Sequence, residues 1–339
     1  MRMYLFVQEK GAFIAKHQGR LRVMKDGERL QEVPVLHLQQ VIVSGGGVSI
    51  SSDAVRVCAE EGIPIHFLSC SGTPHASLYS AGLTGTVLTR RAQLRAYDGP
   101  AGGHLARAFT QGKLQNQANL LRYIAKYRKE TNPDLHTILT GVATEVADSL
   151  HAVRYASGVT VDDLRDTLLG IEGRYAARYW GALMALVPDD LGWPGRETRG
   201  ARDPFNQALN YGYGILYKQI EYAIVLAGLD PYAGLLHADR PGKPSLVLDL
   251  IEEFRQAVVD RTLLGQANRG WTIGQDDEGM LDDRTRKRIV EKVLERLDST
   301  EAYEGKRQPL RHIIQCQARH VATFVRGERP AYTPFVMGW

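Results

Sequence analysis

Short runs of hydrophobic residues that alternate with polar ones occupy about the first eighty residues and predict a β-rich region. Turns that contain glycine separate these runs, and Asp26-Gly27 is the strongest signal for a β-hairpin. One helix interrupts the strands, because Ser51 and Ser52 can cap its first turn and Gly62 ends it. The predicted strands cover residues 4–7, 12–16, 20–25, 29–33, 40–43, 64–68 and 76–79.

Beyond residue 86, hydrophobic positions recur about every 3.6 residues, which is the period of an α-helix. Prolines and glycines separate the helical stretches, and the longest loops are expected around residues 192–196 and 265–279. The final residues, 331–339, show no periodicity, and we expect a flexible tail. The predicted helices cover residues 88–97, 103–128, 134–152, 160–186, 205–227, 245–264, 283–298 and 307–326.

These patterns predict an α+β protein with two domains, since a chain of 339 residues is longer than one domain usually is. The first is a small N-terminal β domain with one helix, over residues 1–86. The second is a larger all-α domain over residues 87–330.

Composition excludes several classes of protein. No uncharged apolar stretch reaches the length of about 18 residues that a membrane span needs, so we expect no membrane contact. The apolar run at the N-terminus is too short for a signal peptide. Three cysteines without a CxxC pair disfavour both a disulfide framework and a structural zinc site. We therefore expect a cytoplasmic protein.

Charge is distributed unevenly along the chain. Residues 88–130 carry nine Lys and Arg against two Asp and Glu, a difference of +7, and residues 284–339 carry twelve against six, a difference of +6. Between them, residues 131–283 carry 13 basic and 23 acidic residues, a difference of −10. This arrangement suits a polyanion that is held at its flanks while a cation sits at the centre. Solvated helix faces are the plainer explanation, and charge alone does not decide between them.

Several common active-site motifs are absent. The glycine run Ser44–Gly47 follows a strand and precedes a helix, but it lacks both the GxGxxG spacing and the lysine of a phosphate-binding loop, so a turn is the better interpretation. The HExxH and GxSxG motifs do not occur, and no cysteine lies beside a plausible histidine base. Most metalloprotease, hydrolase and thiol-enzyme functions are thereby disfavoured.

Glu172 lies between Gly170 and Gly173 inside a helical pattern. Each glycine weakens a helix by about 1 kcal/mol relative to alanine, which suggests that another group approaches the backbone here. A surface glutamate is the alternative.

A histidine and three acids follow later in the acidic centre. His237 precedes a helix on which Asp249 and Glu252 share a face, with Glu253 beside them. Like charges at this spacing repel, so a counter-ion is expected. Imidazole and carboxylate ligands suit Mn²⁺ or Mg²⁺. The alternative is that an arginine such as Arg255 pairs with these acids and that His237 is structural.

A stripe of amide and aromatic side chains occupies the helix predicted over residues 205–227. Its members step by four, three and four residues, which places them on one face. Such a stripe could support metal ligands or contact phosphates, and it could equally form a polar seam between helices. The stripe comprises Asn206, Asn210, Tyr213 and Tyr217, and Arg199 and Arg202 precede it.

Four motifs in the catalytic region occur in a characteristic order. They are Glu172 between glycines, Asp203-Pro204-Phe205-Asn206 with Leu209-Asn210-Tyr211-Gly212-Tyr213, Gly234-Leu235-Leu236-His237, and Ser245-Leu246 with Asp249-Leu250-Ile251-Glu252-Glu253-Phe254-Arg255. Together they resemble the universal CRISPR-associated endonuclease and integrase family, which captures new spacers. The N-terminal region is similar to that family's β domain in residues 41–43, 48–51 and 62–68, so the resemblance covers nearly the whole chain.

The resemblance implies a metal-dependent DNA endonuclease and integrase, with residues 87–330 as its catalytic domain. The family's metal is held by a glutamate, a histidine and an acid on the following helix, positions that match Glu172, His237 and Glu252. Asp249, one turn earlier, would be a supporting or alternate ligand. The expected metal is Mn²⁺ or Mg²⁺. Integration would then be a transesterification in which a DNA 3′-hydroxyl attacks a phosphodiester of the CRISPR repeat.

The resemblance also implies partners: a second copy bound through the β domain, the small ferredoxin-like companion protein of CRISPR adaptation, and double-stranded DNA of the protospacer and the repeat. The alternative function is a non-catalytic DNA-binding scaffold of an antiviral defence complex. A phosphoesterase for small phosphates is disfavoured, because such a substrate needs no basic helix as long as residues 103–128. The candidate DNA contacts are Arg90, Arg91, Arg122, Lys126, Arg199, Arg202 and Asn206.

Overall fold

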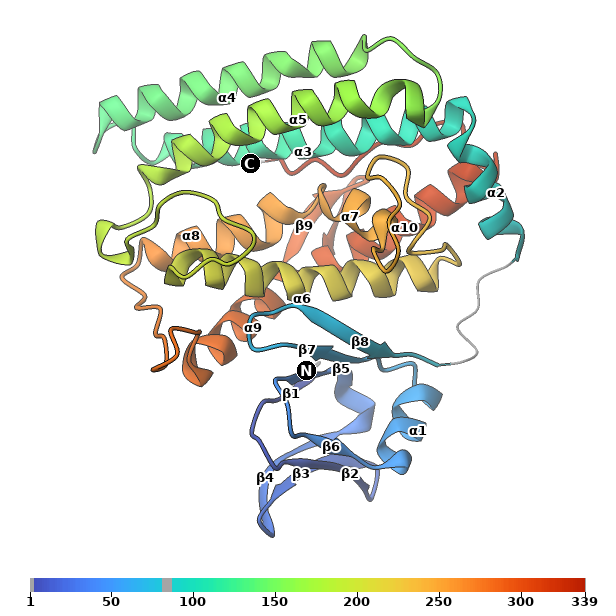
Figure 1. The fold of residues 1–339 in the computed structure, drawn as a ribbon, viewed down its shortest axis with the longest axis vertical. Coiled ribbons are helices and arrows are strands. Elements are labelled where there is room, and N and C mark those ends of the chain that lie inside the picture. Colours follow the sequence, from blue (N-terminus) through green and yellow to red (C-terminus); the bar gives the residue numbers. More distant parts are fainter. Residues whose placement is uncertain (1–2, 81–86, 339) are drawn as a thin grey trace.

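The computed structural model describes residues 3–80 and 87–338, which form a β domain and a larger helical domain (Figure 1). This arrangement confirms the predicted α+β fold class. The predicted domain boundary at residue 86 adjoins residues 81–86, which lie outside the described residues. In the two described ranges, no helix is both long enough and apolar enough to cross a membrane.

Two four-stranded sheets build the β domain, in the orders β1-β5-β7-β8 and β4-β3-β2-β6. Hydrophobic residues such as Leu5, Ile14 and Leu21 form a core of their own with α1. Asp26 and Gly27 have φ angles of 50° and 83° at the turn between β3 and β4, as a tight hairpin requires. The elements are β1 (Met3–Val7), β2 (Phe13–His17), β3 (Arg20–Lys25), β4 (Glu28–Pro34), β5 (Leu38–Ser44), β6 (Ser49–Ile50), α1 (Ser52–Glu60), β7 (Ile65–Leu68) and β8 (Pro74–Leu78).

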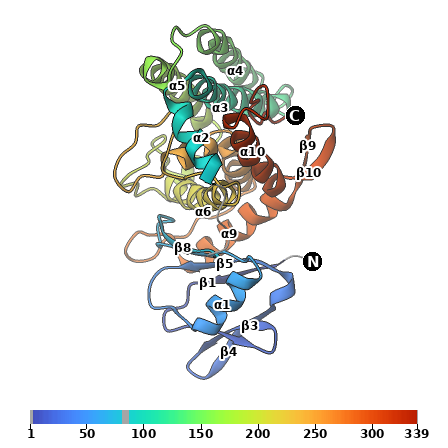
Figure 2. The same ribbon diagram turned by 90° about the vertical axis from the view of Figure 1, so that its right-hand side faces the viewer.

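The helical domain surrounds α6, which is buried along most of its length between the β domain and the other helices (Figures 1 and 2). Helices α3, α4 and α5 pack together at the end of the molecule that is far from the β domain (Figure 2). The elements are α2 (Val87–Tyr97), α3 (Pro100–Lys126), α4 (Pro133–Arg154), α5 (Val161–Met184), α6 (Pro204–Leu226), α7 (Ser245–Ile251), η3 (Gln256–Asp260), α8 (Arg261–Ala267), α9 (Asp283–Asp298), β9 (Thr300–Tyr303), β10 (Lys306–Pro309) and α10 (Leu310–Val325).

The loop between β7 and β8 fixes the two domains against each other. A side chain at Gly72 would overlap the backbone of Tyr211, and one at Gly214 would overlap the carbonyl group of Gly72. Glycine at both positions therefore allows backbone to meet backbone. Beside this contact the Tyr211 hydroxyl donates to Ser44 Oγ at 2.8 Å. Helix α6 is thus anchored on the β domain.

The helix predicted over residues 245–264 is interrupted, and that prediction is wrong in this respect. Helix α7 ends at Ile251, a π-helical turn (η3) follows over residues 256–260, and only then does α8 begin. The turn ends on Asp260, which is buried and accepts hydrogen bonds from Tyr179 and Tyr213. These partners come from α5 and α6, so the local hydrophobic period gave no sign of them.

The helical domain is not all-α, which is a second correction. Strands β9 and β10 form a hairpin in which Glu304 and Gly305 have positive φ angles. The helix expected from residue 307 consequently begins at Leu310. The hairpin escaped prediction because each of its strands has four residues and carries charged side chains.

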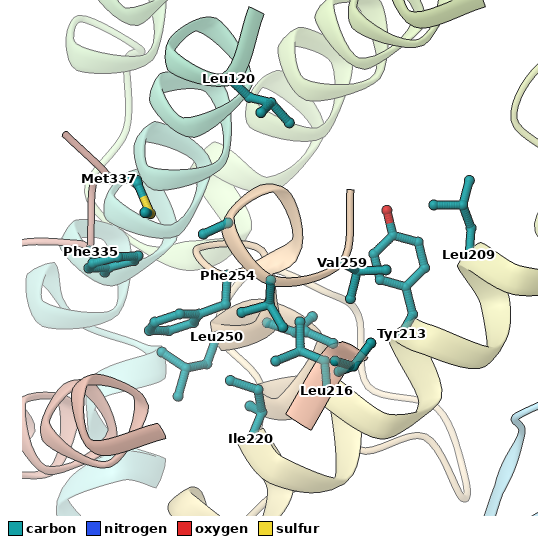
Figure 3. Close-up of a cluster of buried hydrophobic side chains, with 14 of the residues drawn as sticks. Leu120, Leu209, Tyr213, Leu216, Ile220, Leu250, Phe254, Val259, Phe335 and Met337 are labelled. Carbon is teal, nitrogen blue, oxygen red and sulfur yellow. The ribbon is translucent and has the colours of Figure 1, made fainter. Parts of the chain in front are cut away.

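The segment predicted as a flexible tail is packed into the domain core as far as it is described, to residue 338. Tyr332, Phe335 and Met337 are each about 2% exposed or less. The Phe335 ring stacks on Phe254 with 5.0 Å between the ring centroids, and Figure 3 shows both rings beside Leu250. An extended segment that buries only a few large side chains has no regular period, which is why the pattern suggested disorder.

Candidate active site

The sequence-predicted ligands come from three separate segments. Glu172 lies on α5, which continues unbroken through Gly170 and Gly173, and a Cβ at either glycine would meet no described atom within 4 Å. His237 lies in the loop between α6 and α7. Asp249 lies on α7, and Glu252 forms the C-cap of that helix. The structure brings all four side chains into one region of the helical domain.

Lys113 of α3 lies between the two glutamates and was not predicted. Its Nζ atom is 2.6 Å from Glu172 Oε1 and 2.8 Å from Glu252 Oε2, so the two carboxylates converge on one cationic point. Burial alone would raise the pKa of Glu252, but the positive charges of Arg255 and Lys113 lower it to about 2. Glu252 is therefore a carboxylate at neutral pH. The sequence signal was a lysine on a helix face that is otherwise buried, and the excess of basic residues around it concealed that signal.

Asp249 holds His237 in place. One carboxylate oxygen, Oδ1, accepts from the His237 backbone N–H at 2.9 Å and lies 2.8 Å from His237 Nδ1. The other oxygen accepts from the N–H groups of Leu235 and Leu236. Burial lowers the pKa of His237, but the hydrogen bond and charge of Asp249 outweigh it, and the pKa lies above its usual value. Because both oxygens of Asp249 already have partners, its geometry is that of a support.

Glu253, which sequence alone could not separate from Glu252, faces away from the site. It accepts hydrogen bonds from the Tyr332 hydroxyl and from the Phe335 and Gln317 nitrogens. Burial raises its pKa to about 7. Glu253 thus ties α7 to the C-terminal segment, while Glu252 points to Lys113.

A second layer surrounds Glu252. The Nε atom of Arg255 lies 3.3 Å from Glu252 Oε1, and its guanidinium lies over the Tyr213 ring at 4.9 Å. The Tyr213 hydroxyl donates to Asp260, which burial holds at a raised pKa of about 6. The pairing of Arg255 with an acid was one alternative left open by the sequence, whereas Asp260 was not recognised.

The side chains of this site have the right chemistry to bind a metal ion, but they are not positioned to do so. Two carboxylates and an imidazole are the right donors, and Glu172 Oε2 is buried without a hydrogen-bond partner among the described residues. Nevertheless, over residues 3–80 and 87–338 no group of three or more His, Cys, Asp and Glu side chains is close enough to hold a metal as it stands. Lys113 takes the cationic position between the glutamates instead. The donors fit a metal, and Lys113 would have to move to admit it.

Six of the seven candidate DNA contacts are exposed. Arg90 and Arg91 lie on α2, and Arg122 and Lys126 lie on α3. Arg199 and Arg202 line a hollow between the β7–β8 loop and the segment before α6.

Asn206 is the exception and is not available to DNA in this structure. It is fully buried. Its amide nitrogen donates to Gly195 O and Asp203 Oδ2, and its oxygen accepts from Arg196 and from the Glu197 N–H. Asn206 and Asn210 of the polar stripe on α6 therefore fix the preceding loop, since Asn210 also accepts from Arg196 and donates to Thr198 O.

Comparison with known proteins identifies the family. The family described as CRISPR associated protein Cas1 matches residues 5–295. The chain belongs to the Cas1 family. Among curated relatives, the CRISPR-associated endonuclease Cas1 1 of Archaeoglobus fulgidus is 37% identical over 348 residues, covering 99% of this chain and 100% of the relative. That of Pyrobaculum aerophilum is 35% identical over 332 residues, covering 98% and 99%.

Solved structures share the Cas1 fold at lower identity. A casposase bound to an integration product has a TM-score of 0.82 at 22% identity and covers 98% of this chain and 93% of its own. A Cas1 protein from Thermotoga maritima has a TM-score of 0.77 at 22% identity, with 100% and 99% covered. A Cas6-RT-Cas1–Cas2 complex contains a chain with a TM-score of 0.77 at 20% identity, of which this chain covers 36%.

Proposed function

We propose that this protein is a metal-dependent DNA endonuclease and integrase that inserts new spacers into a CRISPR array. The observation that carries the proposal is that the Glu172 and Glu252 carboxylates both contact Lys113 Nζ. His237 is close enough for their negative charges to help raise its pKa. Membership of the Cas1 family and the casposase fold support an integrase over a hydrolase of small phosphates. The activity would take place in the cytoplasm, where the array lies.

Glu172, Glu252 and His237 are the residues that would hold Mn²⁺ or Mg²⁺. Such an ion would lower the pKa of the attacking 3′-hydroxyl and neutralise charge on the phosphate oxygens. The Asp249 carboxylate accepts hydrogen bonds, so it favours a proton on Nδ1 of His237, and in the neutral ring Nε2 would hold the lone pair for ligation. Arg255 balances the charge of Glu252 and keeps its carboxylate ionised.

The proposed reaction is balanced without an external energy source. One P–O bond forms to the incoming 3′-oxygen as another breaks, so a phosphodiester is exchanged for a phosphodiester. The attacking hydroxyl loses one proton and the displaced 3′-oxygen gains one. Water in place of the incoming hydroxyl gives hydrolysis, which would account for an endonuclease activity at the same site.

The β domain offers a surface for a second copy. Leu36 is 85% exposed, and it follows β4, an edge strand that also exposes Leu30. Exposed apolar residues on a sheet edge favour association. The homodimer, the ferredoxin-like companion and double-stranded DNA remain proposals for this chain, and the Cas1–Cas2 complex with a related fold supports the second of them.

The test is strand transfer of a labelled duplex with free 3′-hydroxyls into a plasmid that carries a CRISPR repeat. The reaction is run with and without Mn²⁺ and with the companion protein. We expect a covalent product that depends on Mn²⁺ and is lost in Glu172→Ala. Full strand transfer in Glu172→Ala, or none with any cation in the wild type, would leave the DNA-binding scaffold as the better function.

A further inference from the structure

A buried lysine occupies the point where the two glutamates meet. The Lys113 side chain is 10% exposed, and those of Glu172 and Glu252 are 12% and 3% exposed. The 2.6 Å contact with Glu172 is a charge-assisted hydrogen bond, and the 2.8 Å contact with Glu252 is an ion pair. In the metal-free protein, Lys113 is thus the internal counter-ion of both carboxylates.

The backbone that carries Lys113 has little freedom to move. A Cβ at the preceding Gly112 would lie 3.0 Å from Glu253 Cγ and 2.9 Å from Pro334 Cβ, so α3 packs closely on α7 and on the C-terminal segment. One turn later the Asn116 amide donates to the carbonyl oxygens of Glu253 and Phe335 at 2.9 Å each. Only the flexible four-carbon stem of Lys113 is free to carry the ammonium elsewhere.

Arg255 cannot take over this role, because it meets a different atom. Its Nε lies beside Glu252 Oε1, whereas Lys113 binds Glu252 Oε2. A second cation at the shared point therefore competes with Lys113 and leaves Arg255 in place. Once displaced, the Lys113 ammonium lies at the edge of the site without its two buried partners, and an ammonium in that position is costly unless another anion binds it.

We infer that Lys113 is a displaceable internal cation that couples metal binding to DNA binding. Lys113 and a divalent ion compete for Glu172 and Glu252, and a DNA phosphate supplies the new partner that the displaced ammonium needs. The site would then bind the metal ion weakly in the free protein and tightly in the complex with DNA. The protein would therefore have little hydrolytic activity until its DNA substrate is bound. This inference rests on the proposed function.

The experiment measures Mn²⁺ affinity from the electron paramagnetic resonance signal of free Mn²⁺. The full-length protein is titrated alone and with a duplex whose 3′ ends lack hydroxyls, and binding to the duplex alone is subtracted. In the wild type we expect the duplex to tighten Mn²⁺ binding at least about fivefold, the lower end of typical coupling between sites. Lys113→Met should bind Mn²⁺ at least about fivefold more tightly than the wild type without DNA, and gain little from DNA.

Two further variants make the result specific. Lys113→Arg keeps the charge and can bind carboxylates through two parallel hydrogen bonds, so it should hold Mn²⁺ more weakly than the wild type. This opposite shift also tests the inference if Lys113→Met fails to fold. Lys16→Met removes an exposed positive charge from β2 of the β domain and should match the wild type.

The failures of the two proposals are distinguishable. The role of Lys113 would be overturned if Lys113→Met bound Mn²⁺ more weakly than the wild type, or if DNA tightened Mn²⁺ binding in this variant as much as in the wild type. Strand transfer by the wild type would still support the proposed function in that case. Absence of both Mn²⁺ binding and strand transfer in the wild type would overturn both.

Discussion

Asp249 holds His237 by its backbone and by its ring with the same oxygen atom: Oδ1 lies 2.9 Å from the backbone nitrogen and 2.8 Å from Nδ1. The loop before α7 and the orientation of the imidazole are therefore fixed together by one buried carboxylate. Such outer partners commonly decide how well a histidine binds a metal.

Replacing Asp249 with asparagine is expected to weaken both the fold and the site. The amide can supply only one acceptor oxygen, so at least one of the buried N–H groups of Leu235, Leu236 and His237 loses its partner, at about 1–3 kcal/mol. Mn²⁺ affinity should fall about 10–100-fold. Thermal melting and Mn²⁺ titration measure the two effects. Asp239→Asn, on the same loop but exposed, is the control and should change neither, because the amide oxygen can keep the one hydrogen bond that Asp239 accepts, from the Gly234 N–H.

Glu252→Gln is expected to abolish Mn²⁺-dependent cleavage and strand transfer in a protein that still folds. The variant removes the carboxylate charge that converges with Glu172 while keeping the size of the side chain. Glu145→Gln, which removes an exposed acid paired with Arg178, should remain active. The assay compares product formation at equal folded concentration. Activity near that of the wild type in Glu252→Gln would remove this residue from the ligand set.

The residues of this site that belong to sequence motifs could be predicted, whereas those that tertiary packing brings to the site were missed. Glu172, His237 and Glu252 were named from a family resemblance, and the structure brings them together. Lys113 was not recognised, because its position between the acids depends on α3 and α5 packing side by side. The break after α7 was missed for the same reason, since Asp260 finds its partners on α5 and α6.

Fold class was the easier inference. Periods of two and of about 3.6 residues are local properties, and most strands and helices follow them. The C-terminal segment could not be predicted in this way, because it has no regular period: Phe335 and Met337 pack singly against residues that are distant in sequence (Figure 3). The prediction that Asn206 contacts DNA was wrong for a different reason. An amide on a polar stripe can bind a phosphate or the backbone of a loop equally well, and in the structure Asn206 binds the loop before α6.

Phe335→Ala should destabilise the protein by about 3–5 kcal/mol, the usual cost of deleting a buried phenylalanine ring. The ring stacks on Phe254 and is 2% exposed. The neighbouring Val336 is 39% exposed, so Val336→Ala is the matched control and should cost far less. Chemical denaturation measures both variants. Equal midpoints for the two would show that the segment is not part of the folded core in solution.

Asp260→Asn should change how stability depends on pH. Burial raises the pKa of Asp260 from 3.8 to about 6, so the folded state binds this proton more tightly than the unfolded state. Its stabilising effect is complete below the ordinary pKa and is lost as the pH rises through about 6. Between about pH 4 and 7 the wild type should therefore lose roughly 3 kcal/mol relative to the asparagine variant.

Denaturant titrations at several pH values test this expectation. The Tyr179 and Tyr213 hydroxyls can turn to suit an amide, so Asp260→Asn should remain folded. Asp148→Asn removes an exposed acid from α4 and should run parallel to the wild type. A wild-type curve parallel to that of Asp260→Asn would mean that Asp260 titrates normally.

The last prediction separates DNA binding from chemistry. Arg122 and Lys126 lie four residues apart on α3 and are both exposed. If each contacts a phosphate, replacing both with glutamine should reduce the slope of log affinity against log salt by about 0.9 for each lost contact on duplex DNA. The Mn²⁺ requirement should not change, because neither residue touches Glu172 or Glu252.

Titration of a labelled duplex at several salt concentrations measures that slope. Lys10→Gln with Lys16→Gln removes two exposed charges from the β domain and is the matched control. Glu172→Gln should retain the wild-type slope and bind DNA as well or better, since a negative charge leaves the path of a polyanion. An unchanged slope in the α3 variant would place the duplex elsewhere, with the exposed Arg90 and Arg91 of α2 as the next pair to replace. Weaker DNA binding in Glu172→Gln would instead mean that a cation joins this carboxylate to the phosphate before any bond is exchanged. Two anions in direct contact repel, so the carboxylate alone could not strengthen DNA binding.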